Sequence, residues 1–182
     1  MLTQVTLLVV FQLGWFACVL GAGLGYPWLG PTVLPVVLGL NRWLSSDTPW
    51  AVRGLFRVAL PGILLDTVLG TAGILGFGAN PFAPWLCPPW LLALWFMFAA
   101  MLLNTLGWLA GRDSLAALLG GIFGPLSYYA GERLGALTLG PTLLVGMAIL
   151  AVAWALLLPT LFRVAFRRAA GKPSVSSHRA SV

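Results

Sequence analysis

Charged residues are scarce in this sequence of 182 residues: 8% are Asp, Glu, Lys or Arg, while 60% are hydrophobic. Water-soluble domains carry roughly 25% charged residues, so the composition excludes an ordinary soluble protein and makes a lipid bilayer the expected solvent. One His and two Cys are too few to build a metal site in the membrane. Glycine-rich phosphate loops, paired-histidine motifs and the Gly-x-Ser-x-Gly nucleophile motif are absent too. We therefore expect no metal and no cofactor, and favour a non-enzymatic role over an enzymatic one.

Six apolar stretches, separated by Gly, Pro and charged residues, approach the length of about 20 residues that a helix needs to cross a bilayer. They cover residues 4–20, 28–43, 58–77, 90–110, 114–134 and 142–162. The pattern predicts an all-α polytopic membrane protein with about six transmembrane helices. We expect residues 1–168 to form a single transmembrane domain. Residues 169–182, which are polar and basic, are predicted to be a disordered cytoplasmic tail.

The basic residues set the predicted orientation. If the N-terminus is cytoplasmic, nine of the ten Lys and Arg residues fall on the cytoplasmic side and only Arg133 falls outside, in agreement with the positive-inside rule. The sequence thus predicts a multi-pass protein of the bacterial inner membrane with both termini in the cytoplasm. The net charge of +6 forms no patch on a soluble unit, so the expected partners are membrane lipids and not nucleic acid.

Asp66 lies near the middle of the third apolar stretch. Inserting an unpaired carboxylate at this depth of a membrane costs about 2.5 to 3.5 kcal/mol of free energy. Gly62 and Gly70 lie one helical turn to either side on the same face, which predicts a close helix contact at Asp66. Two interpretations remain open. Asp66 is either a proton- or cation-binding carboxylate or acid/base group, or a protonated carboxyl that joins two helices by a hydrogen bond to Asn104 or Ser127.

Further polar residues in the fourth and fifth stretches complete the predicted site. Asn104 lies in the inner half of the fourth stretch, where an interhelical hydrogen bond is favoured over a substrate contact. Ser127 and Tyr128 lie in a glycine- and proline-interrupted part of the fifth stretch, which can line a site. Glu132 and Arg133 are predicted at the outer end of the same helix, either as interfacial anchors or as contacts to a lipid headgroup.

The two cysteines, Cys18 and Cys87, both fall near the outer surface in the predicted topology. An oxidising periplasm permits a disulfide between them, provided that their Cα atoms lie within reach of one another. A disulfide and two free thiols are both compatible with the sequence.

Four groups of residues stand out in combination. They are Gly14-Trp15; Gly62, Asp66 and Gly70; Pro89-Trp90-Leu91, Leu94-Trp95-Phe96 and Phe98-Ala99; and Gly124-Pro125-Leu126-Ser127-Tyr128, Ala130-Gly131 and Leu134-Gly135-Ala136. Over most of its length except the tail, the chain thereby resembles an uncharacterised family of small bacterial inner-membrane proteins, a domain of unknown function. The resemblance implies several transmembrane helices and no established activity. It also implies a genomic association with a cyclopropane-fatty-acid synthase and an envelope lipoprotein, and hence with membrane-lipid modification.

The leading functional hypothesis is an accessory protein of envelope lipid modification or lipid handling, working with lipids and with lipid-modifying protein partners. It predicts a lipid-accessible cavity between the third, fourth and fifth helices, with Asp66 and Asn104 as its polar floor and Glu132 with Arg133 at its rim. One alternative is a small secondary transporter in which Asp66 titrates as substrate crosses. Another is an intramembrane lipid enzyme that uses Asp66 as acid or base.

Overall fold

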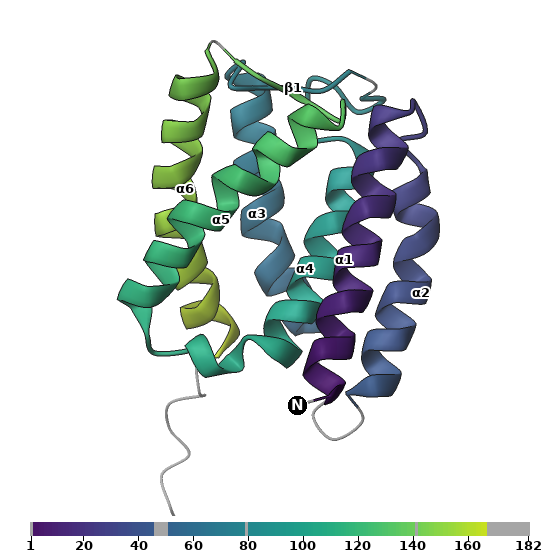
Figure 1. Cartoon of the computed structure of the whole chain (residues 1–182), viewed down its shortest axis with the longest axis vertical. Helices are drawn as coiled ribbons and strands as arrows, with labels where there is room; N and C mark the ends of the chain where they lie inside the picture. The colour runs from purple at the N-terminus through teal and green to yellow at the C-terminus, as the bar shows by residue number, and fades with distance from the viewer. Residues whose placement is uncertain (1, 46–50, 79, 141, 167–182) are drawn as a thin grey trace, which may run out of the picture.

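The computed structural model describes residues 2–45, 51–78, 80–140 and 142–166, which fold into six α-helices (Figure 1). The helices are α1 (Leu2–Gly23), α2 (Leu29–Leu44), α3 (Val52–Thr71), α4 (Pro89–Thr105), α5 (Asp113–Arg133) and α6 (Leu143–Ala165). A 3₁₀ turn, η1 (Gly107–Leu109), follows α4, and the short strands β1 (Leu75–Gly76) and β2 (Thr138–Leu139) follow α3 and α5. The all-α prediction is confirmed, and each helix overlaps one predicted stretch. The tail predicted over residues 169–182 lies outside the described residues.

The third helix departs most from its predicted bounds. It begins at Val52, one residue after an extended Ala51, and ends at Thr71, whereas the apolar stretch covers residues 58–77. The early start adds two helical turns that carry Arg53 and Arg57. A search for apolar stretches leaves these turns out because of the two arginines. The early end comes from Gly73, whose φ of +72° reverses the chain direction.

The two short strands were not predicted, and they arise from matching helix ends. Gly73 after α3 and Gly135 after α5 both adopt left-handed backbone conformations, with φ of +72° and +79°. In each case the next amide donates a 2.9 Å hydrogen bond back to a carbonyl in the last turn of the helix. The chain therefore leaves both helices in the same way, and β1 pairs antiparallel with β2. This pairing joins the ends of α3 and α5.

The helices group into two packing units. α4 lies at the centre of the first unit, where it packs against α1, α2 and α3, and most of its residues are buried. α5 and α6 form the second unit, with the most extensive helix contact in the described chain. α6 packs against α3, while α4 and α5 make hardly any direct backbone contact. Figure 1 shows α5 crossing the bundle obliquely, apart from α1, so a seam runs between the two units.

Two helices have the length and composition of membrane spans. α1 has 22 residues and α6 has 23, and both are long and apolar enough to cross a membrane. α4 is also apolar but has only 17 residues. By length and composition, these two helices suggest an association with a membrane.

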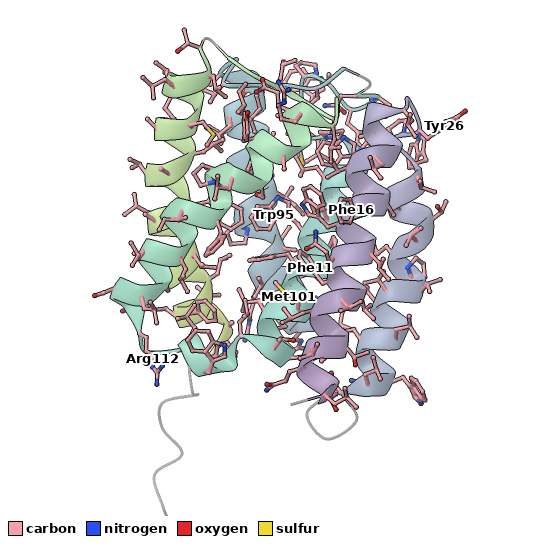
Figure 2. The ribbon with its side chains drawn as sticks, viewed as in Figure 1. Phe11, Phe16, Tyr26, Trp95, Met101 and Arg112 are labelled. Carbon is pink, nitrogen blue, oxygen red and sulfur yellow. The ribbon has the colours of Figure 1, made fainter. Side chains whose placement is uncertain are left out.

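Arginines collect at one end of the bundle. Arg42 lies in the last turn of α2, Arg53 at the start of α3, Arg112 just before α5 and Arg163 in the last turn of α6. These helix ends lie on the side of the N-terminus, where Figure 2 labels Arg112. Arg133, in the last turn of α5, lies at the opposite end.

Candidate functional site

Asp66 is completely buried on α3 and joins three helices. One carboxylate oxygen accepts a 2.6 Å hydrogen bond from the indole N–H of Trp95 on α4. The other accepts a 2.5 Å hydrogen bond from the hydroxyl of Tyr128 on α5. The predicted helix contact at Asp66 is confirmed. Each oxygen has a donor, as a buried carboxylate requires.

Gly62 explains how the bulky Trp95 side chain reaches Asp66. A Cβ atom at position 62, one turn before Asp66, would overlap the six-membered ring of the Trp95 indole. Because glycine has no side chain, the indole packs directly against the α3 backbone. Its N–H then comes within hydrogen-bond distance of the carboxylate, as happens where small residues let two helices approach closely.

An aromatic stack extends this contact to α6. The rings of Trp95 and Trp154 are stacked, with centroids 5.4 Å apart and an interplanar angle of 13°. Phe98 meets both rings edge-on, and Tyr128 meets Trp154 at 67°. Gly124 on α5 provides the space for Trp154, because a Cβ there would overlap the indole. We call Asp66, Trp95, Tyr128 and Trp154 the Asp66 cluster; it bridges the seam between the two packing units.

Trp154 is buried, with only 8% of its surface exposed. Its indole N–H nevertheless has no hydrogen-bond partner in the described part of the chain. The neighbouring Tyr128 hydroxyl donates to Asp66.

The predicted partners of Asp66 are wrong. Asn104 donates a 2.6 Å hydrogen bond to Asn41 on α2, and it lies nine residues beyond Trp95, which is about 14 Å along the helix axis. The Ser127 hydroxyl donates to the carbonyl of Gly124 on its own helix, 2.7 Å away. Asn104 does join two helices, but far from Asp66. Sequence depth alone placed these groups together, and Trp95 was not identified from the sequence as a partner of Asp66.

Glu132 and Arg133 differ in their surroundings although they are adjacent. The Glu132 carboxylate accepts a 2.7 Å hydrogen bond from the backbone amide of Leu139 in β2, so it holds the strand against the end of α5. Arg133 is exposed and forms no ion pair with any described residue. Glu132 thus has a structural partner, while Arg133 is exposed.

A cavity of about 900 Å³ lies along the seam, and we call it the α1–α5 cavity. Its walls come from α1, α4, η1, α5 and α6, and Figure 2 shows Phe11, Phe16, Trp95 and Met101 around the space between α1 and α5. The lining is almost wholly apolar, and Arg133 is the single charged side chain among the described residues that form it. Phe16 and Leu126 line it and are 42% and 48% exposed, so the cavity is open at its side.

The position of this cavity corrects the predicted one. The sequence placed a cavity between the third, fourth and fifth helices, with Asp66 and Asn104 as its floor. Neither residue lines the α1–α5 cavity, whereas Ser127, Tyr128 and Arg133 do. The difference arises because α5 packs on α6 and leaves its other face opposite α1. Asp66 lies behind the wall and accepts hydrogen bonds from two side chains that line it, Trp95 and Tyr128.

A second cavity, of about 370 Å³, lies at the end of the bundle under β1 and β2; we call it the small cavity. Its lining is more polar and includes Thr67, Thr71, Asn80, Cys87 and Thr138. Thr67 follows Asp66 in the chain and accepts a 3.1 Å hydrogen bond from the backbone amide of Cys87. Asp66 therefore lies between two cavities without lining either one.

The two cysteines are free thiols, so no disulfide joins them. Cys18 and Cys87 are both buried. Burial raises the pKa of the Cys87 thiol to about 12, and the nearby Asp66 acts in the same direction. Among the described residues, no three His, Cys, Asp or Glu side chains are grouped so that they could hold a metal ion.

The matches to known proteins concern nearly the whole chain. Residues 4–160 match the family described as "Protein of unknown function (DUF2878)". The chain belongs to the DUF2878 family. The predicted membership of a family defined by a domain of unknown function is thus confirmed. The DUF2878 match includes every residue of the Asp66 cluster and all the residues that line the two cavities. No curated protein and no solved structure matches the chain.

Proposed function

We propose that this DUF2878 protein is an integral membrane protein that accommodates an acyl chain of a membrane lipid in the α1–α5 cavity. In this role it serves envelope lipid modification or lipid handling and need not itself catalyse a reaction. The observation that carries the proposal is the cavity itself: about 900 Å³ of almost wholly apolar space that opens at the side of the bundle.

The outer surface of the helices supports a bilayer as the solvent. Leu60, Leu64 and Val68 follow one another at single-turn spacing on α3 and are 54%, 65% and 52% exposed. Val152 and Leu156 on α6 are 63% and 68% exposed. Continuous apolar stripes of this kind are unusual on a monomer in water, whereas lipid tails cover them without cost.

Six membrane spans are compatible with the helix lengths. α2 and α4, with 16 and 17 residues, extend for about 24 and 26 Å at 1.5 Å per residue. This is a few ångströms less than the hydrocarbon core of about 30 Å, a mismatch that local thinning and flanking residues accommodate. The arginines at the N-terminal end of the bundle then favour a cytoplasmic location of that end, with both termini inside, in a bacterial inner membrane.

The shape of the α1–α5 cavity favours an acyl chain over a water-soluble ligand. Its volume lies near the upper end of the range of about 300 to 1,000 Å³ for small-molecule sites. The side opening between Phe16 and Leu126 would let a lipid tail enter directly from the bilayer, without passing through water. A soluble polar ligand would leave most of the apolar wall without a matching surface.

Asp66 would serve this site as a positioning residue. Trp95 and Tyr128 both line the α1–α5 cavity, and both donate hydrogen bonds to Asp66. The carboxylate thereby fixes the orientation of two wall side chains that come from different packing units. Loss of Asp66 should change lipid binding by moving these walls.

A pair of substitutions on α5 tests the proposal. Ala130 lines the cavity and is small, while Ile122 lies on the same helix, does not line the cavity and is 46% exposed. Purified protein in lipid nanodiscs would be irradiated with a phospholipid that carries a photoreactive group on its acyl chain, and the labelled peptides mapped by mass spectrometry. We expect labelling of α1, α4 and α5 at the cavity wall, reduced several-fold by Ala130→Trp and unchanged by Ile122→Trp. Equal labelling of the cavity wall in the two variants would contradict the proposal.

The position of Asp66 between two cavities supports a second candidate, the small transporter. Trp95 and Tyr128 line the α1–α5 cavity, while Thr67 and Cys87 line the small cavity. A titrating carboxylate between two compartments is a usual element of proton-coupled transport. Reconstituted protein should then move protons into vesicles that contain a pH-sensitive dye, and Asp66→Asn should abolish this flux. No flux from the wild-type protein would exclude this candidate and leave the lipid-binding proposal intact.

A further inference from the structure

We infer that the lipid in the α1–α5 cavity is an anionic phospholipid whose phosphate group binds Arg133 at the outer mouth of the cavity. This inference rests on the proposed function, because it assumes that the cavity takes an acyl chain. It adds the headgroup chemistry and the direction in which the lipid lies.

Within the part of the chain that the structure describes, Arg133 is the one charged side chain in the lining of the cavity. It is exposed, in the last turn of α5, and forms no ion pair with a described residue. A planar guanidinium offers paired N–H donors that match two oxygens of a phosphate group. The lining therefore combines one anion-binding group with an otherwise apolar surface, and this is the chemical pattern of an anionic amphiphile.

The described acidic residues do not neutralise this charge. Glu132 is engaged by the backbone amide of Leu139. Asp66 is completely buried and hydrogen-bonded within the Asp66 cluster. Asp113 forms a 2.7 Å ion pair with Arg163 at the opposite end of the bundle. The guanidinium of Arg133 is thus available for an external anion.

The apolar wall starts directly beside the guanidinium. Leu134 and Leu137 follow Arg133 in the chain and line the same cavity. From there the wall continues along α4 from Trp90 to Met101, a distance of about 16 Å at 1.5 Å per residue. A phosphate at Arg133 would place the first carbons of the acyl chain at the mouth and the rest of the chain between α1 and α5. In the proposed orientation this lipid comes from the outer leaflet.

The test compares lipids that share acyl chains but differ in headgroup. Phosphatidylglycerol, the neutral diacylglycerol and the free fatty acid would each be titrated onto the detergent-solubilised full chain and followed by native mass spectrometry. We expect phosphatidylglycerol to bind about fivefold more tightly than diacylglycerol, the effect of one basic residue near an anionic lipid surface. Arg133→Gln should remove this preference. Arg57→Gln is the matched control, because it removes an exposed arginine at the other end of the bundle and should keep the preference.

The outcomes separate the inference from the proposed function. If both lipids bind equally to the wild-type protein, or if Arg133→Gln keeps the preference, the headgroup inference is overturned; loss of binding in Ala130→Trp would still support the cavity. If the fatty acid binds as tightly as phosphatidylglycerol, Arg133 recognises a carboxylate group, and the headgroup inference is overturned as well. If Ala130→Trp leaves the binding of all three lipids unchanged, the proposed function fails as well.

Discussion

The indole N–H of Trp95 donates a 2.6 Å hydrogen bond to the carboxylate of Asp66, which lies 29 residues earlier in the chain. The other carboxylate oxygen accepts from Tyr128, 62 residues later in the chain. Both donors also line the α1–α5 cavity. A group that is absent from the cavity surface therefore determines the position of two of its walls.

Removing one of the two carboxylate oxygens of Asp66 should lower the free energy of unfolding measurably. In Asp66→Asn, one oxygen is replaced by an NH₂ group, so the side chain accepts only one of the two hydrogen bonds and at best exchanges the other for a bond in which its NH₂ group donates to the Tyr128 oxygen. We expect the free energy of unfolding to fall by about 1 kcal/mol, the net contribution of one hydrogen bond. Tyr128→Phe should have a similar effect, while Tyr129→Phe, at the neighbouring exposed tyrosine, should stay within about 0.5 kcal/mol.

A double-mutant cycle tests whether Asp66 and Tyr128 interact directly. Unfolding by a denaturing detergent would be measured for the wild type, the Asp66→Asn and Tyr128→Phe variants and the double variant. Residues in direct contact usually show an interaction energy of about 0.5 to 3 kcal/mol. Additive effects of the two substitutions would argue against a direct interaction.

The contact between Gly62 and Trp95 should be intolerant of a single methyl group. Gly62→Ala would place a Cβ atom inside the space of the indole ring, so we expect it to cost about 1 to 3 kcal/mol, the usual effect of overpacking. Gly39→Ala is the control: it lies in α2 with open space around its Cβ position, and alanine should be neutral or stabilising there by up to about 1 kcal/mol. Thermal unfolding in detergent compares the two. Equal melting temperatures would show that the indole does not pack on α3.

The free thiols should react slowly in the folded protein. In a Cys18→Ala background, maleimide should label Cys87 slowly at pH 8.5, because the thiol is buried and its pKa is raised to about 12. An ordinary thiol is about half ionised at that pH. Leu24→Cys, at a position that is 73% exposed, provides the fast reference. Denaturation should bring the two rates together, and rapid labelling of folded Cys87 would contradict its buried position.

The proposed orientation can be tested from the two sides of the membrane. In cells that carry single cysteines in a cysteine-free background, Arg112→Cys should be labelled only after the inner membrane is permeabilised. Leu24→Cys should be labelled by an impermeant maleimide from outside. The two positions lie at opposite ends of the bundle, as the labels of Arg112 and the neighbouring Tyr26 in Figure 2 indicate. Labelling of position 112 from the periplasm would invalidate the orientation and the outer-leaflet assignment.

The sequence predicted the helices well because their determinants are local. Apolar length and the intervening glycine, proline and charged residues define where each helix can lie, and each of the six stretches overlaps one helix. The strands could not be predicted in this way. β1 lies inside an apolar stretch that reads as a continuous span, and its pairing with β2 depends on how Gly73 and Gly135 end two separate helices.

The site was predicted only in part, because its contacts depend on how helices pair. Asp66 and Tyr128 were both chosen as candidates, and they do meet. Asn104 was placed with them by depth alone, but it faces Asn41 on α2. Trp95 was missed as a partner, although a tryptophan deep in an apolar stretch needs an acceptor for its N–H. That requirement, together with a glycine one turn from Asp66, is the signal that sequence reasoning could have used.

The seam between the two packing units affects the size of the lipid tails that fit in the α1–α5 cavity. Its width depends on how closely the α5–α6 pair lies against the α1–α4 unit, and Asp66 spans that boundary through Tyr128. A lipid tail wider than the unoccupied cavity could enter only if the α5–α6 pair moved away from the α1–α4 unit. That movement would break the hydrogen bond between Tyr128 and Asp66. The hydrogen bond between Tyr128 and Asp66 acts together with the Trp95–Trp154 stack and the packing of α6 on α3 to hold the two units at this distance. A substitution that weakens the hydrogen bond should broaden the range of lipid tails that fit.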